Sequence, residues 1–271
     1  MTDIVKILAE ELGIKTAQVE ATINLIDEGN TIPFISRYRK EVTGSLNDEI
    51  LRQFDERLKY LRNLEEKKTQ VLSAIEEQGK LTDELKKEIE AAITLVAVDD
   101  LYRPFRPKRR TRAMIAVEKG LENFATAIYV EKLKQPALEE AKKYLSDKEG
   151  LEVETPEDAI AGAMDIIAEK ISDDAAFRNK IRDLSFKQGI LTSVAKDETT
   201  ESVYENYYNF AESVSKTAGY KILAINRGEE EKILTVKLDP PVEEIIRYLE
   251  KCIIKKHNVH TEQILKDTID D

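Results

Sequence analysis

Cationic, aromatic and proline residues concentrate in two segments of an otherwise acidic chain. The stronger segment, residues 103–112, is called the basic loop here. It carries six cations with no acid between them: Arg103, Arg106, Lys108, Arg109, Arg110 and Arg112. Pro104 and Pro107 fix the backbone and limit helix formation, so the cations cannot spread around a helix. This pattern is typical of a segment that binds an anion, and residue types alone leave phosphate and carboxylate equally open.

Two interpretations of the basic loop remain open. In the first, the arginines contact phosphates while Tyr102 and Phe105 stack on bases, because single-stranded nucleic acid is commonly held by that combination. In the second, the two aromatic residues anchor the loop to the core, and the cations pair with Asp99, Asp100 and other acids of the chain. Exposure of the guanidinium groups distinguishes these interpretations.

The second segment, residues 32–44, adds a smaller group of cations: Arg37, Arg39 and Lys40. Pro33 favours the start of a helix there. The spacing of Phe34, Ile35 and Tyr38 predicts an apolar face opposite the cations. We favour a solvated helix face for these cations, and we keep them as candidate nucleic-acid contacts beside the basic loop.

Other polar groups do not form a pattern that indicates catalysis. The adjacent acids Asp99/Asp100 and Asp173/Asp174 would project about 100° apart on a helix, so helix capping is favoured over acid/base or metal chemistry. The single Cys252 lies on an apolar helix face, and two histidines, His257 and His260, leave no Cys/His metal framework. A glycine-rich phosphate loop is also missing from the sequence. We therefore expect no catalytic residue, no metal and no cofactor, and a protein that is not an enzyme.

Composition restricts the class of partner. The chain has 271 residues, of which 41% are hydrophobic and 35% charged, which is enough for one large domain or two ordinary ones. The formal net charge of -11 argues against a general binder of polyanions, so any contact with nucleic acid must be local. The N-terminus has no apolar run of signal length, and no run in the chain is long enough to span a bilayer. We expect a cytoplasmic protein without a membrane partner.

Helical periodicity dominates the chain, so the predicted fold class is mainly α, multi-helical, with a minor β element. Residues 46–78 contain no proline or glycine, and their apolar residues recur at three- and four-residue steps, which predicts one long helix. Glu65 and Lys68 interrupt its apolar stripe, which favours a domain spine over a free coiled coil. Further helices are expected over residues 83–98 and 113–130. The apolar C-terminal half of the first, with Ile93, Leu95, Val96 and Val98, should be buried.

The second half of the sequence continues the helical pattern around two expected strands. Thr155-Pro-Glu-Asp158 is a strong helix start, and Pro240-Pro241 opens another helix. Strands are expected over residues 190–194 and 233–238. We place one helical domain at residues 1–135 and a second helical region with the small β element at 136–271. The last residues have a helical pattern that no glycine or proline closes, which we interpret as a cut chain.

Four segments, in order, resemble the N-terminal part of the Tex family of bacterial transcription accessory proteins: residues 32–44, 56–61, 75–82 and 100–111. Residues 223–228 continue the resemblance more weakly. It implies a helical scaffold fragment with a helix-turn-helix-like N-terminal part. In the family this region precedes an RNase H-like domain, tandem helix-hairpin-helix modules and an OB-fold RNA-binding domain.

The expected function follows from this resemblance. The fragment would belong to a nucleic-acid (RNA) binding transcription factor and would bind RNA or DNA weakly. Its expected partners also include the transcription machinery and the remaining C-terminal domains of the same protein. The alternative is a protein-protein docking module for the transcription machinery with no direct nucleic-acid contact.

Overall fold

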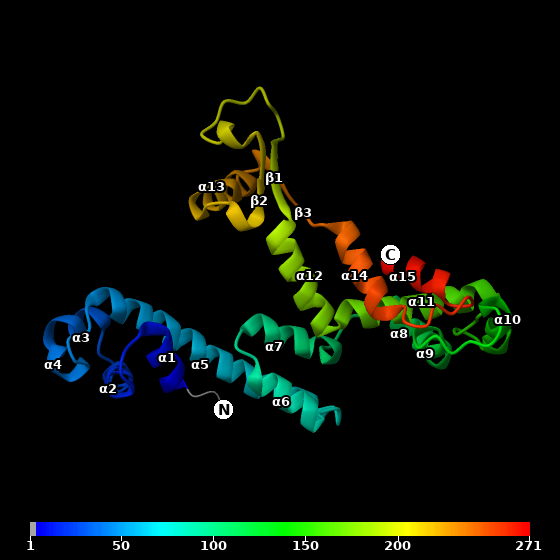
Figure 1. The fold of residues 1–271 in the computed structure, drawn as a ribbon, viewed down its shortest axis with the longest axis horizontal. Coiled ribbons are helices and arrows are strands. Elements are labelled where there is room, and N and C mark those ends of the chain that lie inside the picture. The colour runs from blue at the N-terminus through cyan, green and yellow to red at the C-terminus, as the bar shows by residue number, and fades with distance from the viewer. Residues whose placement is uncertain (1–3) are drawn as a thin grey trace. The chain divides into compact units, whose positions relative to one another are not determined.

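The computed structural model describes residues 4–271 and divides into two compact units, Met1–Phe105 and Arg106–Asp271 (Figure 1). The elements are mainly α-helical with a small three-stranded sheet, so the predicted fold class is confirmed. No helix in the described residues is long and apolar enough to cross a membrane.

The first unit is organised by α5, Asp48–Glu77, the long helix that the sequence predicts. Asn47 begins it, because its side chain accepts a hydrogen bond from the Ile50 amide at 2.8 Å. One face of α5 is buried along its whole length, and the buried residues are Leu51, Phe54, Leu58, Leu61, Leu64, Lys68, Val71 and Ile75. The apolar stripe seen in the sequence is therefore the core of the unit.

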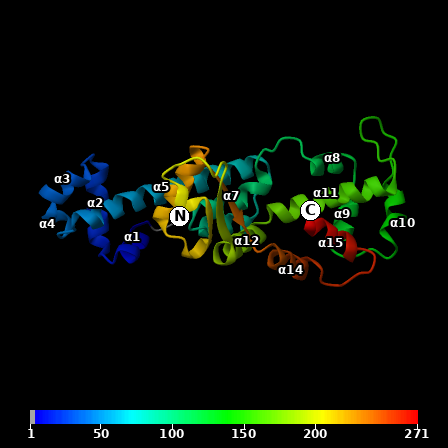
Figure 2. The ribbon, with the colours of Figure 1, turned by 90° about the horizontal axis from the view of Figure 1, so that it is seen from above.

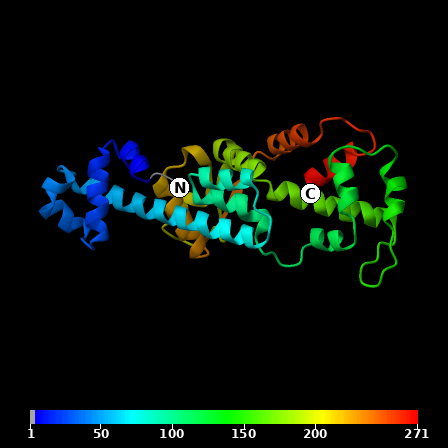
Figure 3. The same cartoon turned by 90° about the horizontal axis from the view of Figure 1, so that it is seen from below.

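Short helices cover the two halves of this spine (Figures 2 and 3). The N-terminal half is covered by α1 (Ile4–Leu12), α2 (Thr16–Asp27), α3 (Ile32–Tyr38) and α4 (Lys40–Thr43), and the C-terminal half by α6 (Asp83–Ala91) and α7 (Leu95–Tyr102). A turn at Gly29, with φ of +85°, joins α2 to α3. The two helices follow each other closely, and a helix-turn-helix function for them stays a prediction.

The single helix expected over residues 83–98 is wrong. The structure has two helices there, because Thr94 caps α7 by accepting a hydrogen bond from the Ala97 amide at 3.1 Å. The break also overturns part of the expected burial, since Ile93 is 69% and Val96 48% exposed, while Val98 is buried as expected.

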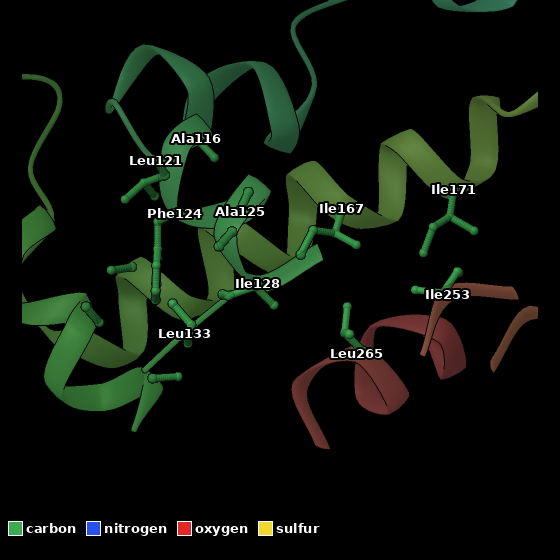
Figure 4. Packing of buried hydrophobic residues seen from close by; sticks show 14 of the residues in the cluster. Ala116, Leu121, Phe124, Ala125, Ile128, Leu133, Ile167, Ile171, Ile253 and Leu265 are labelled. Atoms are coloured by element: carbon green, nitrogen blue, oxygen red, sulfur yellow. The ribbon is translucent and has the colours of Figure 1, made fainter. Parts of the chain in front are cut away.

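The second unit is built around α11, Pro156–Asp173 (Figure 4). Thr155 caps it in a capping box with Asp158, as the sequence indicates. Around it lie α8 (Arg112–Glu118), α9 (Glu122–Tyr129), α10 (Ala137–Ala141), α12 (Ala175–Gln188), α14 (Val242–Ile253) and α15 (Glu262–Asp270). The helix expected over residues 113–130 is divided by Gly120, whose φ of +81° ends α8.

A small antiparallel sheet completes the second unit. Its strands are β1 (Ile190–Ala195), β2 (Asn209–Ser213) and β3 (Leu234–Asp239), in the order β2-β1-β3. Helix α13, Gly219–Glu230, packs against β3 and buries Leu234. The sequence predicts β1 and β3, whereas β2 and α13 are not expected from it.

The division into units differs from the expected domains 1–135 and 136–271. The structure places α8 and α9 with the second unit, because both helices pack against α11. Their residues Ala116, Phe124 and Ile128 lie in the same apolar cluster as Ile167 of α11 (Figure 4).

Candidate nucleic-acid interface

Part of the basic loop is fixed to the second unit through a row of acids on α11. Asp165, Glu169 and Asp173 are spaced four residues apart, so they lie on one face of the helix, and we call them the acidic ladder. The Lys108 ammonium lies 2.8 Å from the Glu169 carboxylate and also bonds to Asp173. Lys108 is therefore neutralised inside the unit.

Thr111 and Arg112 continue the contact between the basic loop and the acidic ladder towards the N-terminal end of α11. Thr111 caps α8 by accepting from the Met114 amide at 3.1 Å, and its hydroxyl donates to Glu169 at 3.3 Å. The Arg112 guanidinium lies 3.2 Å from Asp165. The loop and the acidic ladder thus run antiparallel, with one cation near each end of the ladder.

The electrostatics of Lys108 agree with this geometry. Burial by itself would lower the pKa of Lys108, but hydrogen bonds to Asp173 and Glu169 outweigh burial and raise that pKa above its ordinary value. Lys108 therefore stays charged at neutral pH and remains paired with the ladder.

The two loop residues between these contacts, Arg109 and Arg110, do not pair with the acidic ladder. Arg110 lies 2.5 Å from Glu118 and is 61% exposed in its side chain. Arg109 is exposed and makes no hydrogen bond or ion pair within residues 4–271. The predicted cations are thus not equivalent, since Lys108, Arg110 and Arg112 have acidic partners and Arg109 does not.

The N-terminal end of the loop belongs to the first unit. Arg103 starts a short 3-10 helix, Arg103–Phe105, and is half-buried, whereas Arg106 is exposed at the start of the second unit. Tyr102 and Phe105 pack against the core of the first unit, and the Phe105 carbonyl accepts from the Gln78 side chain at 2.9 Å. This packing supports the anchoring interpretation for the aromatic residues of the loop.

The helices α3 and α4 carry the second predicted group of cations. Arg37 and Lys40 are exposed, and their side chains make no hydrogen bond or ion pair with any residue that the structure describes. Arg39 differs from them, because its guanidinium lies over the Phe34 ring at 5.1 Å and donates to the Tyr38 carbonyl at 3.1 Å.

The apolar face expected on α3 is largely wrong. Only Ile35 is buried, whereas Phe34 is 36% and Tyr38 61% exposed. The side chains of α3 that pack in the apolar cluster around Leu51 of α5 are Ile35 and the partly buried Ile32, and the two aromatic rings are not part of this cluster. The rings of Phe34 and Tyr38 lie 5.2 Å apart at 46° beside the cations. Sequence reasoning missed this exposed aromatic pair, although its spacing of four residues was visible.

Other polar groups have structural partners. Asp174 caps α12, accepting from the amides of Ala176 at 2.9 Å and Phe177 at 3.0 Å, as expected for a helix start. The described residues contain no group of three or more His, Cys, Asp or Glu that could hold a metal ion. The acidic ladder was also missed by sequence reasoning, although its regular spacing was the signal for it.

A cavity of about 610 Å³ in the second unit lies beside Arg112. Its lining includes three arginines and three acids: Arg112, Arg178, Arg182, Asp165, Glu169 and Asp271. Because the charges balance, this cavity does not offer the cationic field that would select a phosphate group.

Family models match two parts of the chain. The model described as the Tex-like protein N-terminal domain matches residues 2–76, and the model described as Tex central region-like matches residues 132–269. The basic loop lies between the two matched parts. The exposed α3–α4 cations lie inside the first.

Relatives from bacteria and animals cover most of the chain. An uncharacterized protein of Bacillus subtilis, YdcI, is 44% identical over 97% of this chain and 37% of its own length. The transcriptional accessory protein Tex of Neisseria gonorrhoeae is 39% identical over 98% of this chain and 36% of its own. The S1 RNA-binding domain-containing protein 1 of Homo sapiens is 31% identical over 88% of this chain and 24% of its own. The chain thus spans little more than a third of these relatives at most and belongs to the Tex-like family, with that family's N-terminal and central regions.

Proposed function

We propose that this chain is a non-enzymatic, cytoplasmic scaffold of a Tex-like transcription accessory protein that contributes a weak, auxiliary contact to nucleic acid. The observation that carries the proposal is the exposure of Arg37, Lys40 and Arg109 without an acidic partner among residues 4–271. A cation that its own protein does not neutralise can release counterions from a phosphate backbone when it binds.

The charge of the chain limits the strength of this contact. The net charge of -11 repels a polyanion at long range. At moderate salt a cation attracts a phosphate against this repulsion only when the two lie within about 10 Å of each other. The acidic ladder further reduces the cations available in the basic loop, because Lys108 and Arg112 are already paired. We therefore assign the contact of each unit separately, to Arg37 and Lys40 in the first unit and to Arg109 in the second.

The names of two relatives support a role in transcription and a contact with nucleic acid. One is named a transcriptional accessory protein and the other an S1 RNA-binding domain-containing protein. Both are much longer than the region they share with this chain, so the strongest contact of the full-length protein to RNA need not lie in this region.

The test is the salt dependence of binding. It is measured by fluorescence anisotropy with labelled oligonucleotides, starting at low salt. The slope of log K against log [salt] should fall by about one unit for each of Arg37→Ala, Lys40→Ala and Arg109→Ala. Lys59→Ala is the matched control, because Lys59 is 73% exposed in its side chain but lies 2.7 Å from Asp55. Equal effects of the control and the three variants, or no association at low salt, would refute the proposed contact.

A docking function is the second candidate, and the exposed face of α13 favours it. Tyr220 is 69% and Leu223 62% exposed, and they lie three residues apart on one helix. We propose that this face would receive the remaining domains of a Tex-like protein. In a pull-down with the C-terminal part of the Bacillus subtilis relative, Tyr220→Ser with Leu223→Ser should abolish capture. Capture that survives both substitutions would count against this face.

A further inference from the structure

The aromatic and cationic residues of α3 and α4 form one compact surface. We define the α3–α4 surface by Phe34, Arg37, Tyr38, Arg39 and Lys40. Phe34 and Tyr38 lie one helical turn apart, and their ring centroids are separated by 5.2 Å. Both aromatic rings are exposed beside exposed cations, whereas Ile35 of the same helix is buried.

Arg39 serves this surface as a positioning residue. Its guanidinium covers the Phe34 ring at 5.1 Å, and it bonds to the Tyr38 carbonyl at 3.1 Å. A cation over a ring restrains both groups. Phe34 is thereby held on one side, while Tyr38, 61% exposed, keeps most of its surface open to a ligand.

Arg37 and Lys40 supply the cationic groups that can meet a ligand, because the Arg39 guanidinium is already in contact with the Phe34 ring and the Tyr38 carbonyl. They flank Tyr38 in the sequence, both are exposed, and neither side chain has a partner among the residues that the structure describes. Glu41 is the only acid between residues 32 and 44. The local charge of this segment is therefore positive, in contrast to the net charge of the whole chain.

We propose that the α3–α4 surface binds single-stranded nucleic acid, with a base stacked on Tyr38 and the neighbouring phosphates on Arg37 and Lys40. This inference deepens the proposed function and rests on it. An open aromatic ring can stack on any base that is not already paired and stacked in a duplex. A duplex offers this surface only its phosphates, so Tyr38 would add nothing to duplex binding.

The experiment compares three labelled probes by fluorescence anisotropy at low salt: a single strand, a strand of the same length that is abasic at every position, and a blunt duplex of the same length. The protein is the full 271-residue chain. Tyr38→Ser should weaken binding of the single strand by about 5- to 150-fold, since base stacking on one aromatic side chain is worth about 1–3 kcal/mol. Tyr38→Phe keeps the ring and should bind as the wild type does.

Two further comparisons separate stacking from charge. Tyr38→Ser should have little effect on the abasic strand and on the duplex, because neither presents a free base to the ring. Arg37→Ala with Lys40→Ala should weaken binding of all three probes and lower the salt slope. Phe186→Ser is the matched control: Phe186 is 57% exposed on α12, but the adjacent Lys187 lies 2.9 Å from Asp183.

Each outcome is decisive. Binding that survives Tyr38→Ser, or that this substitution weakens equally for all probes, overturns the stacking inference and leaves the auxiliary charge contact standing. Tighter binding of the duplex than of the single strand also overturns stacking. No association of the wild type with any probe at low salt overturns both the stacking inference and the proposed function.

Discussion

The ammonium group of Lys108 lies 2.8 Å from the carboxylate of Glu169, a residue 61 positions later in the chain. This contact fixes the centre of the basic loop to α11, where Asp173 accepts from the same ammonium group. The acidic ladder therefore occupies the position that a phosphate backbone would take on these cations. Any nucleic acid that bound Lys108 would have to displace two carboxylates.

Replacement of Lys108 tests directly whether its contact with Glu169 and Asp173 holds the basic loop on α11. Lys108→Met should lower the free energy of unfolding of the second unit by about 1–3 kcal/mol, because two partly buried carboxylates lose their cation. Limited digestion with trypsin, followed by mass spectrometry, should show faster cleavage after Arg109 and Arg110. Lys187→Met is the control, since its exposed pair with Asp183 at 2.9 Å is worth at most about 1 kcal/mol. Equal cleavage rates in both variants would mean that Lys108 does not restrain the loop.

Lys68 is the buried charge of the spine. Its side chain is 4% exposed, and it donates to Glu65 at 2.9 Å and to the Glu90 carbonyl at 2.8 Å. Lys68→Ala should destabilise the first unit by about 3 kcal/mol, because it leaves a carboxylate and a carbonyl without their donor and opens a cavity. Lys67→Ala should cost less than about 1 kcal/mol, since Lys67 is 33% exposed beside Asp99. Urea unfolding of both variants checks the difference, and similar midpoints would contradict it.

Regular local patterns explain which elements the sequence predicts. The spine α5 is recognisable because residues 48–77 contain no proline or glycine and most of their apolar residues recur at helical steps, and α11 because Thr155 and Pro156 mark its start. In contrast, β2 has the sequence Asn-Phe-Ala-Glu-Ser and becomes a strand through its antiparallel pairing with β1. Non-local pairing of this kind leaves no periodic trace in a polar segment.

The sequence predicts the residue types of the candidate site but not the solvent exposure of their side chains. The sequence places cations in the basic loop and beside Tyr38, and it cannot say which cations meet an acid of another element. Asp165 and Glu169 lie more than fifty residues from the cations that they neutralise. For the same reason the periodicity of α3 indicates an apolar face, whereas burial of Phe34 and Tyr38 depends on whether another helix covers them.

Gly228 is required where α13 approaches β3. A Cβ atom at this position would lie 2.6 Å from Leu234 Cδ1 and 3.2 Å from Tyr204 Cγ. Gly228→Ala should therefore destabilise the second unit by about 1–3 kcal/mol through overpacking. Gly219→Ala, in the first turn of the same helix, would meet no atom within 4 Å and should be neutral or slightly stabilising. Thermal unfolding distinguishes the two variants, and an equally small change in both would show that the contact can relax.

Glu131 links the end of α9 to the segment after α14, and this link should depend on pH. Its carboxylate accepts from the amides of Lys255 at 2.8 Å, Lys256 at 2.7 Å and Asn258 at 3.2 Å. Burial by itself would raise the pKa of Glu131, but these backbone hydrogen bonds outweigh burial and lower the pKa below its ordinary value.

Because the pKa of Glu131 is lowered by folding, its carboxylate stabilises the folded state fully at neutral pH. This contribution should disappear as the pH falls from the ordinary glutamate pKa of about 4.3 through the lower pKa of the folded state. Glu131→Gln should thus be less stable than the wild type at pH 7, and the difference should shrink in acid. Glu139→Gln is the control, since Glu139 is 55% exposed beside Lys142. Urea unfolding at pH 7 and about pH 3 measures both differences; a constant gap for Glu131→Gln would mean that its charge does not hold this link.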